Sequence, residues 1–279
     1  YWVGGAVRDR LVGRLSLDFD LAIESEGGAQ RLADYLYSLA PEYFSRPHFL
    51  GQGYPIWQIV LQHYPPELEA WKTFGPLEIQ VADTQIEMFP DPQIRQRITK
   101  YGTLMQDCAR RDFTCNMLYQ NCVSGEVLDP SGCGIEDIRQ GILRGHPAMM
   151  PEKMFFEDPL RILRLFRFQA LFAWKLDAKL IEGVKKTKTR LSILSPERVH
   201  KEWVKVMEGG GHAKFFRSLD QYDVLETLFP ELMSMKGCLQ DKKFHSEGDV
   251  WVHTLLVMEK TPHDIELQLA ALLHDLGKV

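Results

Sequence analysis

The first twenty residues contain the pattern that most constrains the fold of this chain. The sequence begins with a turn at Gly4 and Gly5, followed by a short helical segment. An apolar run then carries Asp18 and Asp20, one residue apart. Alternate side chains of a strand point to the same face, so a strand here would bring both carboxylates together. A glycine turn beside them would let a phosphate approach the backbone, so the pattern predicts a site for hard cations and a nucleoside triphosphate.

The residue types around the two aspartates suit phosphoryl or nucleotidyl transfer. A pair of Mg²⁺ ions can clamp the attacking oxygen and the leaving phosphate in such reactions. Mg²⁺ is usually held by one or two protein carboxylates together with substrate phosphates, so Asp18 and Asp20 are candidate catalytic residues and metal ligands. Gly4 and Gly5 would offer backbone N–H groups to the triphosphate, and Arg8 could reach one of its oxygens.

Glu78 is a candidate third carboxylate, because it lies at the start of a strand-like segment over 77–82. The D-x-D spacing alone is equally typical of two solvated aspartates on an exposed strand edge. The glycine turn, Arg8 and the apolar residues that alternate with the aspartates together favour the catalytic interpretation.

The charge of the chain is unevenly distributed. The 279 residues carry a net charge of −5. Between residues 160 and 217, fourteen Lys and Arg occur with five Asp and Glu, a local excess of nine that leaves about fourteen negative charges elsewhere. A basic surface that neutralises nucleic-acid phosphates explains this division, although solvated helix faces would give the same counts. The candidate phosphate-contacting residues are Lys185, Lys186, Lys188, Arg190, Lys201 and Lys205.

Composition narrows the class of protein. No apolar run approaches the roughly 18 to 20 residues of a membrane span, and no signal peptide is visible, so we expect no membrane partner. Five cysteines without a C-x-x-C pair favour free thiols in a reducing cytoplasm. Tyr1 in place of an initiator Met, and an end just after an apolar helical pattern, favour a chain clipped at both ends.

Hydrophobic periodicity predicts an α/β head followed by an all-helical body. The expected strands cover 17–23, 56–62 and 77–82, and the expected helices of the head cover 6–11 and 30–39. From residue 151 the pattern is helical almost throughout, over 156–173, 177–189, 196–207, 212–219, 221–228, 249–260 and 264–276. We therefore predict a head over 1–146, a helical body over 147–235 and a further helical unit that begins at 236–279.

Five ordered motifs, over about residues 1 to 230, resemble one known family. The segment G-G-A-V-R-D at 4–9, followed by D-x-D, is similar to the class II tRNA nucleotidyltransferases, which comprise the CCA-adding enzymes and bacterial poly(A) polymerases. Further similar segments are R-R-D-F-T-C-N-M at 110–117, the segment from Asp129 to Arg144, E-D-P-L-R at 157–161 and S-P-E-R at 195–198.

The resemblance implies a polymerase-β-like head with a mixed sheet, and template-independent nucleotide addition. It implies Asp18 and Asp20 as ligands of Mg²⁺. It also implies that the incoming nucleotide is contacted by Gly5, Arg8, Arg111, Asp158, Arg161, Arg164 and Arg167. Asp83 stands where many members carry Arg, and the loop expected over 84–107 is hard to match. Because that loop is associated with switching from C to A addition, the extent of CCA specificity stays open.

The segment from Asp158 onward also has a physical interpretation. Asp158 is predicted to cap a helix that begins at Pro159, with Arg161 and two later arginines along one flank. A carboxylate that accepts from an exocyclic amino group, and a guanidinium that donates to the adjacent ring nitrogen, suit both cytosine and adenine. Guanine and uracil present the reverse polarity. The alternative is a capped core helix with an exposed arginine stripe.

Two charged pairs are candidates for supporting roles. Asp112 could hold Arg111 in place through an ion pair. Glu197 and Arg198, at a helix start, could act similarly. A capping box with surface charge is an equally good interpretation of either pair.

The last forty residues resemble the start of an HD-domain phosphohydrolase. His253, His274 and Asp275 occur in the family's order and carry ligands suited to a divalent metal. Single buried histidines are more often ordinary core residues, and the family's further downstream Asp is beyond the end of this chain.

We therefore predict a tRNA nucleotidyltransferase that adds CMP and/or AMP from CTP and ATP to the 3′ end of tRNA. Three alternatives stay open: a poly(A) polymerase or a CC-only or A-only enzyme of the same class, an HD-type phosphohydrolase whose head binds RNA, and a tRNA-binding module without activity.

Overall fold

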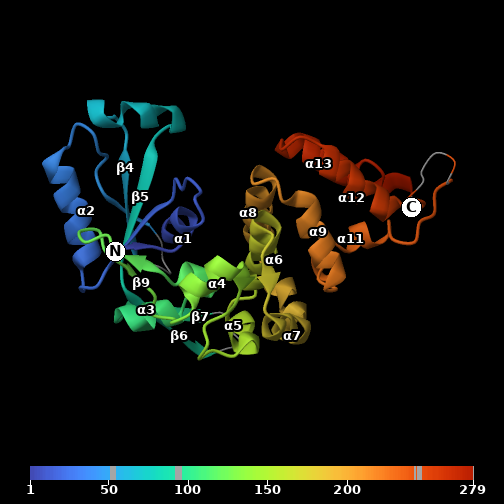
Figure 1. Cartoon of the computed structure of the whole chain (residues 1–279), viewed down its shortest axis with the longest axis horizontal. Helices are drawn as coiled ribbons and strands as arrows, with labels where there is room; N and C mark the ends of the chain where they lie inside the picture. The colour runs from blue at the N-terminus through green and yellow to red at the C-terminus, as the bar shows by residue number, and fades with distance from the viewer. Residues whose placement is uncertain (51–54, 92–95, 242, 244–246, 279) are drawn as a thin grey trace. The chain divides into compact units, whose positions relative to one another are not determined.

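The computed structural model describes residues 1–279 except 51–54, 92–95, 242, 244–246 and 279 (Figure 1). The chain forms two compact units. The first contains Tyr1–Gln140 and Arg144–Ala148, and the second contains Gly141–Leu143 and Met149–Val279. The expected division of the helical part at residue 235 stays a prediction.

The first unit is built on a mixed seven-stranded sheet. Its strands are ordered β3-β4-β5-β2-β1-β8-β9. Their bounds are β1 (Trp2–Val3), β2 (Phe19–Ile23), β3 (His48–Leu50), β4 (Ile56–Leu61), β5 (Leu77–Asp83), β8 (Tyr119–Gln120) and β9 (Val127–Leu128). β2 is parallel to β5, whereas the other neighbouring pairs are antiparallel. The predicted mixed sheet of the head is confirmed.

Short helices flank this sheet. They are α1 (Gly5–Leu11), α2 (Gly28–Leu39), the 3₁₀ helices η1 (Pro66–Phe74) and η2 (Thr114–Asn116), α3 (Leu104–Ala109) and α4 (Gly134–Gln140). α2 packs against β4 and β5 (Figure 1). A buried cluster joins β1 and β2 to α3 and the segment that follows it. Its members are Val3, Ala22, Leu104, Cys108, Met117 and Tyr119.

Two local expectations for the head are wrong. The strand expected from residue 17 begins at Phe19. Just before it, the backbone N–H of Asp18 donates to Oγ of Ser16 at 3.3 Å, a local side-chain bond that competes with strand pairing. The loop expected over 84–107 instead contains an antiparallel hairpin of β6 (Gln85–Asp91) and β7 (Gln96–Tyr101). β6 contains Pro90, a residue type that is more typical of loops and edge strands.

The second unit is predominantly helical, as predicted. Its helices are α5 (Pro151–Glu157), α6 (Leu160–Phe172), α7 (Ala178–Thr187), η3 (Lys188–Ile193), α8 (Pro196–Glu208), α9 (His212–Gln221), α10 (Leu225–Leu228), α11 (Pro230–Met233), α12 (Val250–Lys260), α13 (Ile265–Leu273) and η4 (Leu276–Lys278). A parallel pair, β10 (Ile142–Leu143) with β11 (Lys175–Leu176), completes it. No helix among the described residues is long and apolar enough to cross a membrane.

The helix expected over 156–173 is interrupted at Asp158 and Pro159. Pro159 has no N–H to donate, and the residue before a proline avoids the helical region. Asp158 accordingly has φ −138° and ψ 94°, between the end of α5 and the start of α6. The helix expected over 221–228 is likewise shortened to Leu225–Leu228, because Asp223 takes a left-handed φ of 55°.

Candidate active site

The glycine turn connects β1 to α1 and lies against two predicted site residues. Gly4 has φ 66° and ψ −127°, a conformation that side chains with a Cβ rarely adopt. A Cβ at Gly4 would lie 3.3 Å from Nη1 of Arg111. A Cβ at Gly5 would lie 3.6 Å from Oδ2 of Asp18. The structure therefore brings a guanidinium and a carboxylate to the same turn, as the sequence predicts.

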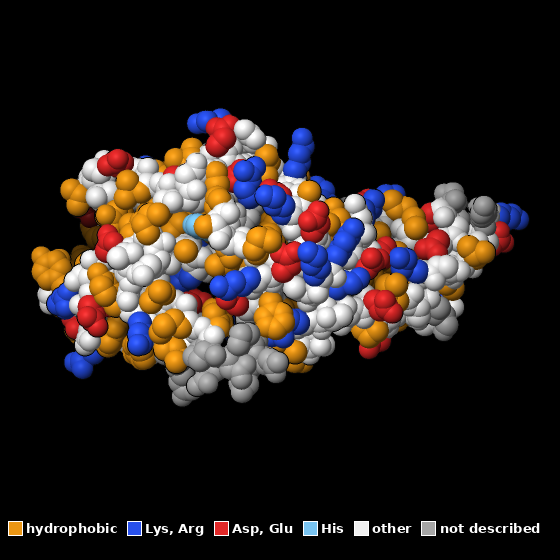
Figure 2. Space-filling model, turned by 90° about the horizontal axis from the view of Figure 1, so that it is seen from below, with side chains coloured by type: hydrophobic (Ala, Val, Ile, Leu, Met, Phe, Trp, Pro, Cys, Tyr) orange, Lys and Arg blue, Asp and Glu red, His pale blue; other side chains and the backbone are white. Residues whose placement is uncertain are grey.

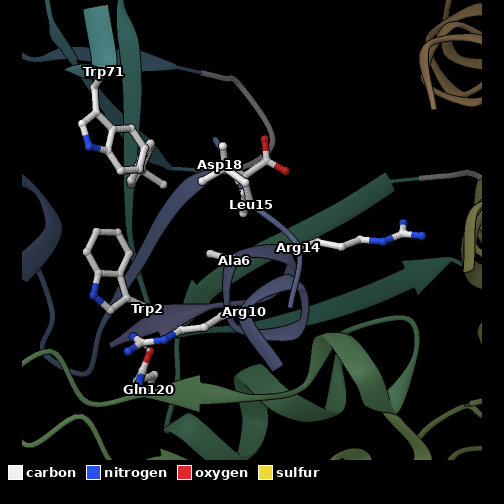
Figure 3. Close-up of a pocket in the computed structure, with 10 residues that line it drawn as sticks. Trp2, Ala6, Arg10, Arg14, Leu15, Asp18, Trp71 and Gln120 are labelled. Carbon is white, nitrogen blue, oxygen red and sulfur yellow. Dashed lines mark hydrogen bonds between the residues drawn. The ribbon is translucent and has the colours of Figure 1, made fainter. Parts of the chain in front are cut away.

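Asp20 is half-buried on β2, and Asp18 is exposed just before this strand. Asp20 lines a cavity of about 160 Å³ together with Arg110 and Arg111. Asp18 lines a different cavity, beside α1 (Figure 3). The two carboxylates are therefore neighbours along the chain, and each lines its own cavity.

The parallel register of β2 and β5 pairs Phe19 with Ile79. Asp18 directly precedes Phe19, and Glu78 directly precedes Ile79. The Glu78 side chain is exposed and accepts a hydrogen bond of 2.6 Å from Nε2 of Gln58. Its role as a third carboxylate stays a prediction.

Arg8 is held by two polar neighbours inside the head. It is only 7% exposed, although it is charged. Its Nε donates to Oδ1 of Asp9 at 2.8 Å, and its Nη1 donates to Oδ1 of Asn116 at 2.7 Å. Asn116 in turn donates to Oδ1 of Asp112 at 2.9 Å. Asn116 of the R-R-D-F-T-C-N segment, 108 residues after Arg8 in the sequence, thus orients the Arg8 side chain.

Asp107 and Tyr119 fix Arg111. Oδ2 of Asp107 accepts from Nε and Nη2 of Arg111 at 3.1 and 2.9 Å, and from the Tyr119 hydroxyl at 2.6 Å. Tyr119 also accepts from Nε of Arg111 at 3.0 Å. With Nε and Nη2 engaged, Nη1 is directed at Gly4. The expected ion pair between Arg111 and Asp112 is therefore wrong: Asp107, one helical turn earlier on α3, is the partner of Arg111.

The electrostatics of this network favour an ionised Asp107. Burial opposes ionisation, but the nearby Arg111 and Arg110, with hydrogen bonds from Tyr119 and Arg110, lower the pKa of Asp107 to about 2. Burial is also the main cause that raises the pKa of Tyr119 above its ordinary value, so its hydroxyl keeps its proton. A further ion pair of 3.1 Å joins Arg110 to Glu87 on β6. Sequence analysis missed Asp107 and Tyr119, although the i,i+4 spacing of Asp107 and Arg111 was a usable signal.

Asp83 has a structural role that explains its departure from the family pattern. Its two carboxylate oxygens accept from the backbone N–H groups of Gly27 and Ala29 at 2.6 and 2.7 Å. These groups lie at the start of α2, where a carboxylate also complements the helix dipole. An arginine could not accept these bonds.

In the second unit, Asp158 is paired with Arg198. Nη2 of Arg198 lies 3.2 Å from Oδ1 of Asp158, which links the E-D-P-L-R and S-P-E-R motifs. Oδ1 of Asp158 also lies 3.4 Å from the backbone N of Leu160, as a cap would. α6 begins at Leu160 rather than at Pro159, so the predicted cap is shifted by one residue.

The alternative interpretation of α6, a core helix with an exposed arginine stripe, is wrong for two of the three arginines. Arg161 and Arg167 are 7% and 6% exposed. Nη1 of Arg167 lies 3.1 Å from Oε2 of Glu202, a buried residue of α8, and Nη1 of Arg164 lies 3.8 Å from Oε1 of the same residue. Arg161 reaches the carbonyl oxygen of Met154 at 3.4 Å. Buried charges require partners, and Glu202 supplies one.

The predicted RNA-binding residues lie on two elements of the second unit. Lys201 and Lys205 line a groove on α8 with Arg198. On α7 and η3, Lys186 pairs with Glu152, Lys188 pairs with Asp223, and Arg190 lies over the ring of Phe156 at 3.7 Å, while Lys185 is exposed. On the face in Figure 2, Lys and Arg side chains are interspersed with Asp and Glu. Their RNA-binding role stays a prediction.

His253, His274 and Asp275 come together as predicted. One ligand atom from each lies within 4.8 Å of the others. His253 also contacts Glu247 through Nδ1. Burial opposes ionisation of Asp275, but Lys278 and the two histidines hold the pKa of its carboxyl below its usual range. The cluster therefore offers two imidazoles and one carboxylate to a cation.

Comparison with known proteins identifies the family. The poly A polymerase head domain matches residues 59–144, and the "probable RNA and SrmB- binding site of polymerase A" matches residues 175–236. A multifunctional CCA protein of Nitrosococcus oceani is 33% identical over the whole of this chain and 62% of its own length. The chain belongs to the class II tRNA nucleotidyltransferases. A second such protein, from Xanthomonas campestris, is 31% identical over 63% of its length. This class II nucleotidyltransferase chain thus spans about three fifths of these curated relatives.

Solved structures share the fold of this nucleotidyltransferase chain. The Bacillus stearothermophilus CCA-adding enzyme in complex with CTP has a TM-score of 0.61 at 23% identity, over 99% of this chain and 58% of that one. A tRNA-processing enzyme with CTP has a TM-score of 0.68 at 21% identity, over 99% and 68%. The Thermotoga maritima CCA-adding enzyme complexed with tRNA has a TM-score of 0.62 at 23% identity, over 99% and 64%.

Proposed function

We propose that this protein adds CMP and/or AMP from CTP and ATP to the 3′ end of tRNA and releases pyrophosphate. The observation that carries the proposal is the position of the glycine turn. An ideal Cβ at Gly4 would lie 3.3 Å from Nη1 of Arg111, and an ideal Cβ at Gly5 would lie 3.6 Å from Oδ2 of Asp18. A triphosphate needs backbone N–H groups, a cationic fork and carboxylates that hold its cation in such proximity. The names of the relatives are consistent with this activity, and we propose that it takes place in the cytoplasm.

Asp18 and Asp20 are the proposed metal ligands. Class II nucleotidyltransferases use divalent metal, and the oxygen donors of these carboxylates favour Mg²⁺. Bound Mg²⁺ would activate the terminal ribose hydroxyl and neutralise charge on the α-phosphate and the leaving pyrophosphate. Arg8 and Arg111, each fixed by hydrogen bonds inside the head, would bind phosphate oxygens without the cost of ordering a mobile side chain.

Asp158 and Arg161 are the proposed selectors of the base. The carboxylate of Asp158 would accept from the exocyclic amino group of cytosine or adenine, and Arg161 would donate to the ring nitrogen. Nη2 of Arg198, 3.2 Å from Oδ1 of Asp158, would orient this carboxylate. Arg164 and Arg167 are proposed to support this helix and the nucleotide. We expect Asp158→Ala to relax the preference for CTP and ATP over UTP and GTP more than it lowers triphosphate affinity. Unchanged preference would contradict this role.

The groove on α8 is the proposed contact for tRNA phosphates in the second unit. Lys201 and Lys205 line it together with Arg198, and positively charged groups attract the negatively charged phosphates of a nucleic-acid backbone. We propose that Lys185, Lys186, Lys188 and Arg190 add to this phosphate contact on α7 and η3.

A nucleotide-incorporation assay separates this function from its rivals. The full-length protein is incubated with all four NTPs and Mg²⁺, and with either tRNA that lacks its CCA end or an unstructured RNA. We expect short additions of C and A to the tRNA, abolished in Asp20→Asn and retained in the matched variant Asp34→Asn on exposed α2 surface. Long A tails on both RNAs would instead identify a poly(A) polymerase.

A second function is favoured by the cluster of His253, His274 and Asp275, whose ligand atoms lie within 4.8 Å of one another. We propose that it holds a divalent metal in an HD-type phosphohydrolase unit of the full-length protein. His274→Ala should then abolish hydrolysis of phosphodiesters and leave nucleotide addition intact, whereas Asp18→Ala should do the reverse. Hydrolysis that survives His274→Ala would exclude this site.

A further inference from the structure

Polar side chains from β2, β5 and β4 share one face of the sheet in the head. Asp20 is the strand partner of Gln80, and Gln80 is in turn the partner of Gln58. Glu78 lies two residues before Gln80 on β5, so its side chain points to the same side of the sheet. This face therefore presents two carboxylates and two amides, whereas the opposite face carries apolar residues such as Ile79.

Gln58 holds the carboxylate of Glu78. Its Nε2 donates to Oε2 of Glu78 at 2.6 Å. Gln58 is only 8% exposed, so the packing around it fixes the donor, whereas Glu78 is exposed. An exposed glutamate otherwise samples many rotamers and loses that freedom when it binds a ligand. Because the donor is fixed, the Glu78 carboxylate is already restrained before any cation binds.

The partner of Glu78 is neutral, which distinguishes this carboxylate from others in the chain. Asp107, Asp158 and Glu202 each pair with an arginine. Among the residues that the structure describes, no Lys or Arg pairs with Glu78. An amide donor orients a carboxylate without neutralising it, so the negative charge of Glu78 can act on a cation.

Glu78 lies within reach of the cation site proposed at Asp20. Positions two apart on a strand are separated by about 6.6 Å along it, and neighbouring strands lie about 4.8 Å apart. The register therefore places the Cα atoms of Asp20 and Glu78 about 8 Å apart. From one face of the sheet, a short and a long carboxylate side chain can span that distance to one cation. With Oε2 engaged by Gln58, Oε1 of Glu78 is the oxygen that can serve as a ligand.

We propose that Gln58 is a positioning residue, which holds Glu78 as a third carboxylate of the cation site of Asp18 and Asp20. The inference rests on the proposed nucleotidyl transfer and adds a residue to its cation site. Glu78 contributes an oxygen donor of the kind that suits Mg²⁺. Gln58 touches neither the cation nor the nucleotide and acts through Glu78. Its loss therefore weakens the affinity for the cation and leaves the rate at saturating cation almost unchanged.

Gln58→Leu tests this role, with Gln268→Leu as its matched control. Both substitutions remove the amide of a buried glutamine and keep its approximate size. Gln268 belongs to α13 of the second unit, where its Nε2 donates to the carbonyl oxygen of Thr261 at 2.8 Å.

Two quantities are measured on the full-length protein. The first is the Mg²⁺ concentration that gives half of the maximal rate of CMP incorporation. The second is the Kd of Mn²⁺, measured by electron paramagnetic resonance without RNA or NTP. The part of the Mn²⁺ binding that Asp20→Asn removes defines the site in the head.

We expect Gln58→Leu to raise both quantities by about tenfold, because residues that hydrogen-bond metal ligands typically contribute that much to metal affinity. The rate of Gln58→Leu at saturating Mg²⁺ should stay within about twofold of wild type. Glu78→Gln should raise both quantities at least as much. In the Glu78→Gln background, Gln58→Leu should add less than about twofold, because it acts through Glu78. Gln268→Leu should lower stability and leave both quantities within about twofold.

Equal effects of Gln58→Leu and Gln268→Leu on the Mg²⁺ requirement would overturn the assignment, as would effects of Gln58→Leu and Glu78→Gln that multiply in the double variant. An unchanged Mg²⁺ requirement in Glu78→Gln would also overturn it. That variant replaces an exposed side chain, so it tests the role even if Gln58→Leu fails to fold. If the wild-type protein incorporates no nucleotide but Mn²⁺ binding shows the expected pattern, the proposed transfer fails and the role of Gln58 stands.

Discussion

Asp107 provides the sharpest quantitative test of how the head holds Arg111, the arginine that we propose to bind the nucleotide. Its side chain is 1% exposed, and it accepts from Arg111, Arg110 and Tyr119. Asp107→Asn keeps the shape and removes the charge. Both arginines then lose a buried anion, and Nε and Nη2 of Arg111 lose the acceptor that directs Nη1 toward Gly4. We expect lower stability and weaker CTP binding from one substitution.

The magnitude follows from the pKa of Asp107, which is lowered from 3.8 to about 2. At about 1.4 kcal/mol per pKa unit, the ionised carboxylate stabilises the folded state by about 2 kcal/mol at neutral pH. Because the folded-state pKa lies below the unfolded value, this stabilisation is fully present above about pH 5 and is lost as the pH falls toward 2. Arg111, left with the Tyr119 hydroxyl as acceptor and without a buried anion, can bring the total loss at neutral pH to about 3 kcal/mol.

The assay is urea unfolding of the wild-type protein and Asp107→Asn at several pH values. The difference in unfolding free energy should fall by about 1 kcal/mol between pH 5 and pH 3. Glu136→Gln is the matched control, because Glu136 pairs with Arg139 on the exposed surface of α4 and should change stability by less than about 0.5 kcal/mol. A difference between wild type and Asp107→Asn that does not change with pH would refute the electrostatic account. An unchanged CTP KM would refute the positioning of Arg111.

Three further substitutions test other parts of the account. Gly4→Ala should cost about 1 to 2 kcal/mol of stability because of the positive φ, and should raise the CTP KM by displacing Arg111; urea unfolding and initial rates measure both. Arg198→Met should increase incorporation of UMP and GMP without a comparable loss of triphosphate affinity, because Asp158 loses its ion-pair partner; sequencing of the products measures this. His274→Ala should lower bound metal, measured by inductively coupled plasma mass spectrometry, and leave CMP incorporation unchanged.

The sequence was sufficient to predict the parts of the site whose residues lie close together along the chain. The glycine turn, α1 and the aspartates lie within twenty residues, so their proximity follows from one turn and one helix. Periodicity was sufficient for β4, β5 and α8, whose bounds each differ from the expected range by one residue at one end. The order of the motifs indicated the family before any contact was known.

The contacts that organise the site are long-range, and sequence did not reveal them. Glu202 lies 35 residues after Arg167, and no local pattern indicates that α6 and α8 bury this pair together. In the sequence, Tyr119 is only an aromatic residue of a short strand. Its role follows from the hydrogen bonds that its hydroxyl makes with Asp107 and Arg111. The ring contact between Phe19 and Trp71 of η1 similarly joins residues that are 52 positions apart in the sequence.

The most direct test of the central claim is the sequence of the 3′ ends that the full-length protein makes. Three tRNA transcripts are supplied with all four NTPs and Mg²⁺: one lacks the whole CCA end, one lacks its last two bases and one lacks only the final A. The account predicts that only C and A are added, that addition stops at the restored end, and that Asp18→Ala and Asp20→Asn remove it. Incorporation that persists in both aspartate variants, or that includes U and G as readily as C and A, would contradict it.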